Sequence, residues 1–341
     1  MSSSSTTSNT PQRRKNRLRR ALYAGVAALA LVCAAWSGLW LLAARAAQTN
    51  LDNWILQEAD QGRLWACQNT QFGGFPLRLE IICSKAAFSG EVGDAPRIAD
   101  ANQVRLLARI WSPDVVHIAI KGPLRIESAG QAQRIDVKWT RLHAELQMAP
   151  QARQRLSATI DGLSARPTEG ESAQLPWSAD HLTFDVRPSI DRANAYDIAL
   201  TAKGAASPAL RTWLASGAPV NASLQATVPN AAHLLADPSL QGVEAWRRAG
   251  GAVTIENARV SQNQARIEAS GRLTVDSAHR LKGRLRAQES HLGPLLAHLG
   301  APSSVIMMDS LIGSLALPIT FDRGRLSIGP FLTSARLISL Y

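Results

Sequence analysis

Residues that carry out chemistry in proteins are thinly spread along this sequence. Its seven histidines are scattered, and the familiar nucleophile, metal and phosphate motifs (G-x-S-x-G, H-E-x-x-H, G-x-x-x-x-G-K-[ST], G-x-G-x-x-G and C-x-x-C) are absent. Asp180 and His181 lie close to Ser178, but proximity along a chain does not establish a catalytic triad. His291 and His298 are seven residues apart on a predicted helix, without a third metal ligand beside them. We therefore expect a non-enzymatic protein with no catalytic residues, no metal site and no cofactor.

An uninterrupted apolar segment lies near the N-terminus. Residues 21–44 contain no charged side chain and, at about 1.5 Å per helical residue, are long enough to cross a hydrocarbon core of about 30 Å. Trp36 and Trp40 near its C-terminal end are suited to a membrane interface. Residues 1–45 carry seven basic and no acidic side chains, so that only about +4 of the net charge of +11 belongs to the rest of the chain. The basicity indicates membrane topology rather than nucleic-acid binding.

Three segments follow from this pattern. We expect a basic cytoplasmic tail (residues 1–20), a transmembrane helix (21–44) and a translocated domain (47–341), because basic residues are retained in the cytoplasm. A cleaved signal peptide is the alternative, since Ala44-Arg45-Ala46 resembles an A-x-A cleavage site. Against cleavage, the apolar segment is longer than the usual 7–15 residues and Arg45 lies inside the site. Either way the main domain lies outside the cytoplasm.

Two of the three cysteines are candidates for a disulfide bond. Cys67 and Cys83 lie in the translocated part, where an oxidising compartment favours pairing, and they would close a loop of 17 residues. A metal site shared by the two is the alternative, but no histidine lies between or beside them. Cys33 lies within the apolar segment, where it is expected to be a small packing residue.

Alternation of apolar and polar residues dominates the translocated chain and predicts strands. The alternating runs are Leu77–Ile82, Ile135–Trp139, Leu182–Val186, Tyr196–Leu200, Val253–Ile255, Arg266–Ala269, Leu273–Val275, Leu281–Leu285 and Leu315–Phe321. One apolar and one polar face indicate an antiparallel sheet with one side covered and one side solvated. We therefore predict a mainly β domain with a large antiparallel sheet, and both a curved, groove-like sheet and a sandwich fit the pattern.

Helical signals are few and do not alternate regularly with the strands, which argues against a parallel α/β fold. Residues 48–62 predict an amphipathic helix that either continues the apolar helix or packs against the start of the domain. Further short helices are predicted at 208–215, 230–236, 241–249 and 291–299. A polar loop at 166–176 suggests a boundary between two parts of the domain. The nine tryptophans either anchor the core or line an apolar groove.

A turn and strand segment follows the first translocated cysteine. Gly74 permits a turn, Phe75 offers an apolar contact and Pro76 restricts the backbone where a strand begins; Arg78 and Glu80 then alternate with apolar residues up to Cys83. We interpret this segment as a structural motif.

The same segment carries a family resemblance. Together with the anchor, the Trp54 helix, Trp65-Ala66-Cys67 and the stretch Phe321–Phe331, it resembles the uncharacterised proteobacterial family called domain of unknown function 2125, over nearly the whole chain. The resemblance implies a bacterial host, in which the topology predicted above is that of a single-pass membrane protein with a cytoplasmic N-terminus and a translocated domain. No catalytic residues are implied.

A second resemblance concerns Gly271–Asp276 and Leu281–Leu285, which are similar to the strand–turn–strand repeats of AsmA-like envelope proteins. This likeness implies an anchor in the bacterial inner membrane, a curved, apolar-lined β-groove in the periplasm and a part in envelope lipid homeostasis. We therefore expect a non-enzymatic membrane-anchored envelope protein that contacts membrane lipid through an apolar β-groove. The alternative is a periplasmic scaffold that binds another envelope protein. A third hypothesis is an enzyme with an unfamiliar site, and the identity of the ligand or partner and the oligomeric state stay open.

Overall fold

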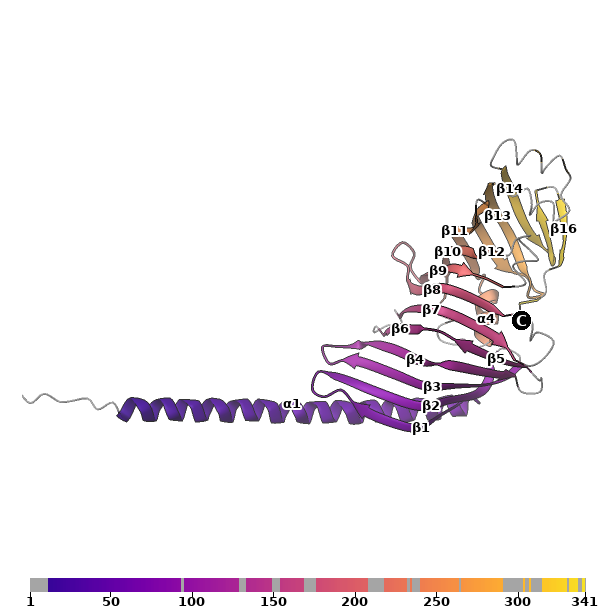
Figure 1. Ribbon diagram of the computed structural model, residues 1–341. Coiled ribbons are helices and arrows are strands. Elements are labelled where there is room, and N and C mark those ends of the chain that lie inside the picture. Colours follow the sequence, from indigo (N-terminus) through magenta and orange to yellow (C-terminus); the bar gives the residue numbers. More distant parts are fainter. Residues whose placement is uncertain are drawn as a thin grey trace, which may run out of the picture.

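The chain begins with a helix of 49 residues, α1 (Gln12–Asp60), which is about 74 Å long at 1.5 Å per residue (Figure 1). The helix contains the whole apolar segment, and the predicted amphipathic helix at 48–62 is its continuation rather than a separate element. The computed structural model describes residues 12–92, 95–128, 133–148, 154–168, 176–207, 218–231, 234, 240–263, 265–290, 303, 307, 315–329, 331–336 and 339–340.

In the described part of the chain, sixteen strands follow α1. They are β1 (Leu64–Gly73), β2 (Arg78–Val92), β3 (Ala95–Arg109), β4 (Ser112–Ser128), β5 (Gln133–Lys138), β6 (Arg141–Gln147), β7 (Arg155–Pro167), β8 (Trp177–Pro188), β9 (Ala195–Ala205), β10 (Val220–Pro229), β11 (Ala252–Gln262), β12 (Ala265–Val275), β13 (Leu281–Ser290), β14 (Leu315–Asp322), β15 (Arg325–Ile328) and β16 (Phe331–Arg336). A short helix, α4 (Leu240–Arg248), lies between β10 and β11.

All sixteen strands belong to one antiparallel sheet in which neighbours along the chain are neighbours in space. The exception is β5 and β6, which pair with the two halves of both β4 and β7 and so act as one interrupted strand. Strand directions change progressively from nearly parallel to α1 at β1 to steeply inclined at β14 (Figure 1). The described chain is therefore a single twisted sheet, and the sandwich alternative was wrong.

A line of irregularities crosses the sheet from β2 to β10. Each strand has one, and the positions face one another on neighbouring strands: Lys85, Asn102, Gly122–Pro123, Trp139–Thr140, Gly162, Asp180, Gly204 and Asn221. Polar side chains bridge the line, since Asn102 Nδ2 donates to the Gly122 carbonyl at 2.8 Å and Asn221 Oδ1 accepts from the Gly204 N–H at 3.0 Å. Extra residues of this kind bend strands and strengthen twist. We call this line the crease.

The crease also preserves the two faces of the sheet. A regular strand would place Ile160 and Leu163 on opposite faces, because side chains alternate with a period of two. Both belong to one apolar cluster, as do Ala179 and Leu182 on the neighbouring strand. The extra residue in each strand therefore shifts the alternation by one, so that the apolar face continues on the same side of the sheet.

The disulfide bond ties the first two strands together. Cys67 of β1 and Cys83 of β2 are bonded, with their Cα atoms 5.5 Å apart, and this is the pairing that the sequence favoured. The bond joins β1, the edge strand that lies against α1, to its neighbour β2.

Replacing both Cys67 and Cys83 with serine is expected to destabilise the fold by about 3 kcal/mol, because the loop of 17 residues is then unconstrained in the unfolded chain. Urea unfolding of the full chain in detergent, followed by tryptophan fluorescence, measures the loss. Cys33→Ser is the control, since Cys33 is a free, exposed thiol within α1. Equal unfolding midpoints for the two variants would contradict the expectation.

Most of the predicted strands are present, and α4 confirms the helix predicted at 241–249. The runs Arg266–Ala269 and Leu273–Val275 are parts of one strand, β12, rather than two strands. The helices predicted at 208–215 and 291–299, most of that at 230–236, and most of the loop at 166–176 lie outside the described residues.

Candidate functional site

One face of the sheet is apolar across most of the described strands. Strand register aligns a row of twelve directly paired residues from β1 to β13: Phe72, Ile81, Leu106, Ile118, Ala144, Ala158, Phe184, Leu200, Leu224, Ala258, Ala269 and Ala287. Directly paired residues point to the same face. No member of this row, which we call the first apolar row, is polar. At about 4.8 Å between strands, the row is about 50 Å long.

A second apolar row lies two residues away on each strand except β11, where a bulge makes the step three, and it therefore lies on the same face. It runs through Leu79, Ala108, Val116, Leu146, Leu156, Val186, Ile198, Ala226, Ile255, Gly271, Leu285 and Ile319. Register shifts at Gln225/Ala226 and at Ile255/Ala258 keep apolar residues in the rows across β10, β11 and β12. The two rows together make a continuous apolar surface across most of the sheet.

The opposite face is polar. The row between the two apolar rows contains Glu80, Leu107, His117, Glu145, Ser157, Asp185, Ala199, Gln225 and Asn257, of which seven are polar. Ion pairs such as Arg105–Glu80 (2.9 Å) and Arg259–Glu268 (2.9 Å) lie on this face. The sheet is thus amphipathic as a whole, with one face suited to water and one to apolar matter.

In the described residues, helix α4 covers only one part of the apolar face. Helix α4 packs Trp246, which is 5% exposed, against Tyr196, Val228 and Ala231 near the β9–β11 ends, and the Trp246 indole N–H donates to the Pro229 carbonyl at 2.9 Å. Elsewhere most apolar side chains on this face are only half-buried, and no large side chain among those described is fully buried. Leu200, in the first apolar row, is 39% exposed.

Helix α1 forms the border of the apolar face at strand β1. The ring centroids of Trp54 and Trp65 are 5.5 Å apart, and Trp65 in turn contacts Phe88 at 4.7 Å. Phe88 lies on the apolar face, because its row continues through Ala99 to Ile126. The helix therefore lies beside the apolar face and covers the otherwise open edge of the sheet.

An ion pair links the end of α1 to the residue that precedes β1. Arg63 holds Glu58 through two hydrogen bonds, Nε to Oε2 at 2.6 Å and Nη2 to Oε1 at 2.7 Å, and the Trp65 indole N–H also reaches Glu58 at 3.3 Å. The Arg63 hydrogen bonds lower the pKa of Glu58 below its ordinary value, against the opposing effect of burial.

This lowered pKa predicts an acid-dependent contribution to stability. A carboxyl group with a lower pKa in the folded state stabilises it above the unfolded-state pKa, and the contribution is lost as the pH falls through the folded-state pKa. Arg63→Gln should therefore lower the urea midpoint at pH 7, and the difference from the unmodified chain should shrink as the solution becomes acidic. A difference that grows at acid pH would contradict this assignment.

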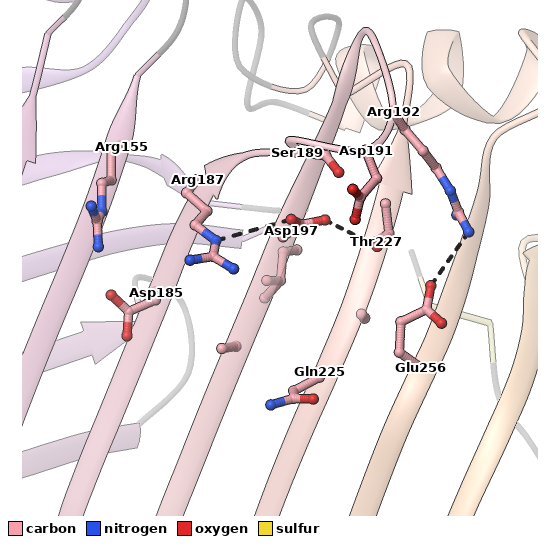
Figure 2. A pocket seen from close by; sticks show the side chains of 13 residues that line it. Arg155, Asp185, Arg187, Ser189, Asp191, Arg192, Asp197, Gln225, Thr227 and Glu256 are labelled. Carbon is pink, nitrogen blue, oxygen red and sulfur yellow. Dashed lines mark hydrogen bonds and ion pairs between the residues drawn. The ribbon is translucent and has the colours of Figure 1, made fainter.

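The polar face carries a pocket of about 560 Å³ over β7 to β11, shown in Figure 2. Asp197 accepts a hydrogen bond from Thr227 (3.0 Å) and pairs with Arg187 (4.0 Å), and Arg192 pairs with Glu256 (3.5 Å). Three arginines and four carboxylates line it, so that its formal charges nearly cancel. This balance does not favour an anionic or a cationic ligand.

The histidines on this face form two polar clusters that the sequence did not predict. His117 of β4 lies 3.3 Å from Glu145 of β6, and the His117 and His143 rings stack at 5.6 Å with an angle of 23°. Donor atoms of these three residues lie within 4.8 Å of one another. The two rings are stacked on the solvated face, and Glu145 lies beside one of them. The observed arrangement is therefore a polar cluster.

The other cluster is a pair. His181 Nδ1 lies 2.7 Å from Asp161 Oδ1 on the neighbouring strand, so that Asp161, and not the adjacent Asp180, is the carboxylate beside this ring. Ser178 instead forms a backbone bridge with Ala206. Among the described residues, no hydroxyl or thiol group is hydrogen-bonded to His181. Ser178, Asp180 and His181 are thus not assembled into a triad. His291 and His298 lie outside the described residues.

The predicted structural motif forms the turn between β1 and β2. Gly74 has a φ of +98°, and a Cβ atom there would lie 2.6 Å from the Arg78 carbonyl oxygen, which explains the glycine. Phe75 and Arg78 are exposed, and the peptide bond before Pro76 is cis. Glu80 pairs with Arg105 on the polar face. In the structure this segment is a turn followed by the start of β2.

Fold and surface together define a class of protein: a single amphipathic antiparallel sheet bordered by one long helix that, by length and composition, is able to cross a membrane. The chain belongs to a family of uncharacterized proteins conserved in bacteria, DUF2125, whose model matches residues 40–334. A comparison with curated proteins found no match, and neither did a comparison with solved structures. The resemblance to AsmA-like envelope proteins is not shown by these comparisons.

Proposed function

We propose that this chain is a non-enzymatic, single-pass protein of the bacterial inner membrane whose periplasmic sheet forms an apolar groove that holds lipid. The observation that carries the proposal is the pair of uninterrupted apolar rows, each twelve strands wide, on one face of the sheet. The AsmA-like pattern at Gly271–Asp276 agrees with it.

The anchor is supported by the composition of α1. Its apolar segment, residues 21–44, lies after six basic residues at 13–20 and before a single one at Arg45, which favours a cytoplasmic N-terminus. Exposed leucines and valines on this part of the helix, such as Leu29 and Val32, agree with a lipid environment. This orientation places the sheet in the periplasm.

Lipid is the class of ligand that the apolar surface fits. A face about 50 Å long is several times the length of one acyl chain, which spans half of a hydrocarbon core of about 30 Å. Covering exposed apolar side chains such as Leu200 is favourable by about 25 cal/mol for each Å² of apolar surface removed from water. An acyl chain laid along the rows would remove this surface from water without needing any hydrogen-bonding partner.

The absence of catalysis is part of the proposal. The polar clusters on the opposite face are engaged among themselves: Glu145 lies beside His117, Asp161 beside His181, and Asp197 between Arg187 and Thr227. These pairs are ordinary cross-strand contacts on a solvated face.

Site-specific photocrosslinking tests the proposal. Benzoylphenylalanine replaces either Leu200, in the first apolar row, or Thr201, the next residue on the opposite face, in cells that carry the full chain. Irradiation followed by intact-mass measurement should give a lipid adduct at position 200 and none at position 201. The two sites are adjacent on β9 and so differ only in the face that they sample.

Adducts of equal yield at both positions, or none at position 200, would reject the lipid groove. An adduct with a discrete protein at position 200 would instead favour the scaffold alternative. That alternative has one observation of its own: β16 pairs with β15 alone in the described residues, and an edge strand can accept a strand from a partner protein.

A further inference from the structure

The turn between β1 and β2 is attached to the end of the apolar part of α1. The Trp36 indole N–H donates to the Pro76 carbonyl at 2.9 Å, and the Trp40 indole N–H donates to the Arg78 carbonyl at 3.0 Å. The ring of Phe75 packs edge-on against Trp40, with the centroids 5.5 Å apart. These contacts hold the turn at a defined height along the helix.

That height is the outer boundary of the hydrocarbon core. Arg20 is the last charged residue before the apolar segment, and Trp40 follows it by 20 residues, or about 30 Å of helix, which equals the thickness of the core. If Arg20 lies at the cytoplasmic boundary, Trp40 and the turn beside it lie at the periplasmic boundary. Part of α1 extends beyond the sheet on the N-terminal side, as this placement requires (Figure 1).

Other turns lie at the same end of the sheet. The β3–β4 turn is adjacent to the β1–β2 turn, since the Ile110 N–H donates to the Leu77 carbonyl at 3.3 Å, and β6 ends beside the start of β4, where the Met148 N–H donates to the Asp114 carbonyl at 2.7 Å. Large apolar side chains are exposed on all three: Phe75, Leu77, Trp111 and Met148, with Trp111 66% exposed. We call the β1–β2 turn, the β3–β4 turn and the end of β6 the anchored rim.

The apolar rows run out to this rim. Leu77 precedes Leu79 and Ile81 with the same spacing of two, and Met148 follows Leu146 and Ala144 in the same way. The face is therefore apolar up to the turns near α1. At the β9–β11 ends, by contrast, α4 covers it with Trp246.

Two positively charged side chains face each other at the rim. Arg78 and Arg109 are direct partners on β2 and β3, and both are exposed. Glu80 is shared, at 2.9 Å with Arg105 and at 3.9 Å with Arg78. Like charges directly opposite one another destabilise a sheet, and an anionic phosphate between them would relieve the repulsion.

We propose that the anchored rim sits in the periplasmic leaflet of the membrane that α1 crosses, with Leu77 and Trp111 among the lipid acyl chains and Arg78 and Arg109 at the phosphates. The apolar face then opens directly into that leaflet, so that a phospholipid passes from the bilayer onto the sheet without crossing water. This proposal rests on the membrane anchor of the proposed function, and it adds the source of the lipid and the place where it reaches the sheet.

Spin labels of single cysteines test the placement. The full chain carries Cys33→Ser, which removes the free thiol, while Cys67 and Cys83 are bonded to each other and do not take a label. It is reconstituted in vesicles of phosphatidylethanolamine and phosphatidylglycerol. Labels are attached at Leu77→Cys and Trp111→Cys. Trp177→Cys, 44% exposed at the start of β8 on the opposite end of the sheet, is the matched aqueous control, and Leu29→Cys within the apolar segment is the membrane control.

Collision rates with oxygen and with a water-soluble nickel chelate report the depth of each label. We expect the ratio of oxygen to nickel collisions to be raised at positions 77 and 111 relative to position 177, towards the value at position 29. Ratios at 77 and 111 equal to that at 177, with 29 inside the membrane, would overturn the rim while the anchor stands. A label at 29 exposed to the nickel chelate would overturn the anchor itself and the rim with it.

Discussion

Replacing Gly283 with alanine is expected to destabilise the fold by about 3 kcal/mol, because the backbone there leaves no room for a side chain. Gly283 lies in β13 with a φ of +151°, and a Cβ atom would overlap the carbonyl oxygen of Arg272 on β12 and lie 3.1 Å from the Leu273 Cα. Both neighbours are backbone atoms of a paired strand, so that relief would require the two strands to separate. Urea unfolding of the full chain in detergent measures the loss.

Gly73→Ala is the matched control. Gly73 also lies in a strand, β1, but no atom lies within 4 Å of its added Cβ and its φ is not positive. We expect its unfolding midpoint to stay close to that of the unmodified chain. A small effect at both glycines would mean that β12 and β13 are not paired as observed.

Trp246→Ala is expected to cost about 3–5 kcal/mol, the range for removing a large aromatic side chain from a packed site. Trp246 is buried between α4 and the apolar ends of β9 to β11, and it also loses the hydrogen bond to the Pro229 carbonyl. The variant uncovers the covered end of the apolar face as well. We therefore expect increased binding of a hydrophobic dye along with a lower unfolding midpoint.

Two controls separate the causes. Trp246→Phe retains most of the packing and loses the hydrogen bond, which should cost about 1 kcal/mol. Trp111→Ala removes a tryptophan that is 66% exposed and should leave the midpoint nearly unchanged, although it belongs to the anchored rim. If Trp246→Ala behaved like Trp111→Ala, α4 would not be packed on the sheet.

The lipid groove and the membrane-inserted rim depend on different features of the sheet. Lipid contact needs only the apolar rows, for which the crosslinking contrast between Leu200 and Thr201 is decisive. The route from the bilayer also needs the rim to lie at membrane height, which depends on two indole hydrogen bonds to the β1–β2 turn. A chain whose rim is lifted from the membrane could still hold lipid, and the two experiments are independent for this reason.

Local sequence pattern determined the elements of this protein. The alternation in Leu182–Val186 and Tyr196–Leu200 predicted β8 and β9, and the turn residues Gly74 and Pro76 predicted the start of β2, because side-chain alternation and turn dihedrals depend on neighbouring residues only. The apolar segment of α1 and the disulfide partners were also recognisable from composition and spacing. Eight of the described strands, among them β3 and β4, lay outside the predicted runs; in β3 and β4 the crease interrupts the alternation, at Asn102 and at Gly122–Pro123.

Tertiary structure alone decided how these elements align. Residues far apart in the chain, such as Phe72 and Ala287, share one row only because strand register brings twelve strands into line, and register depends on long-range pairing that local alternation does not encode. The same is true of His117 and His143, which meet across β4 and β6, and of Trp36 and Trp40, whose indoles reach a turn about 40 residues away. The chain's own pattern made the strands amphipathic; pairing in register turned twelve of them at a time into the rows of one apolar face.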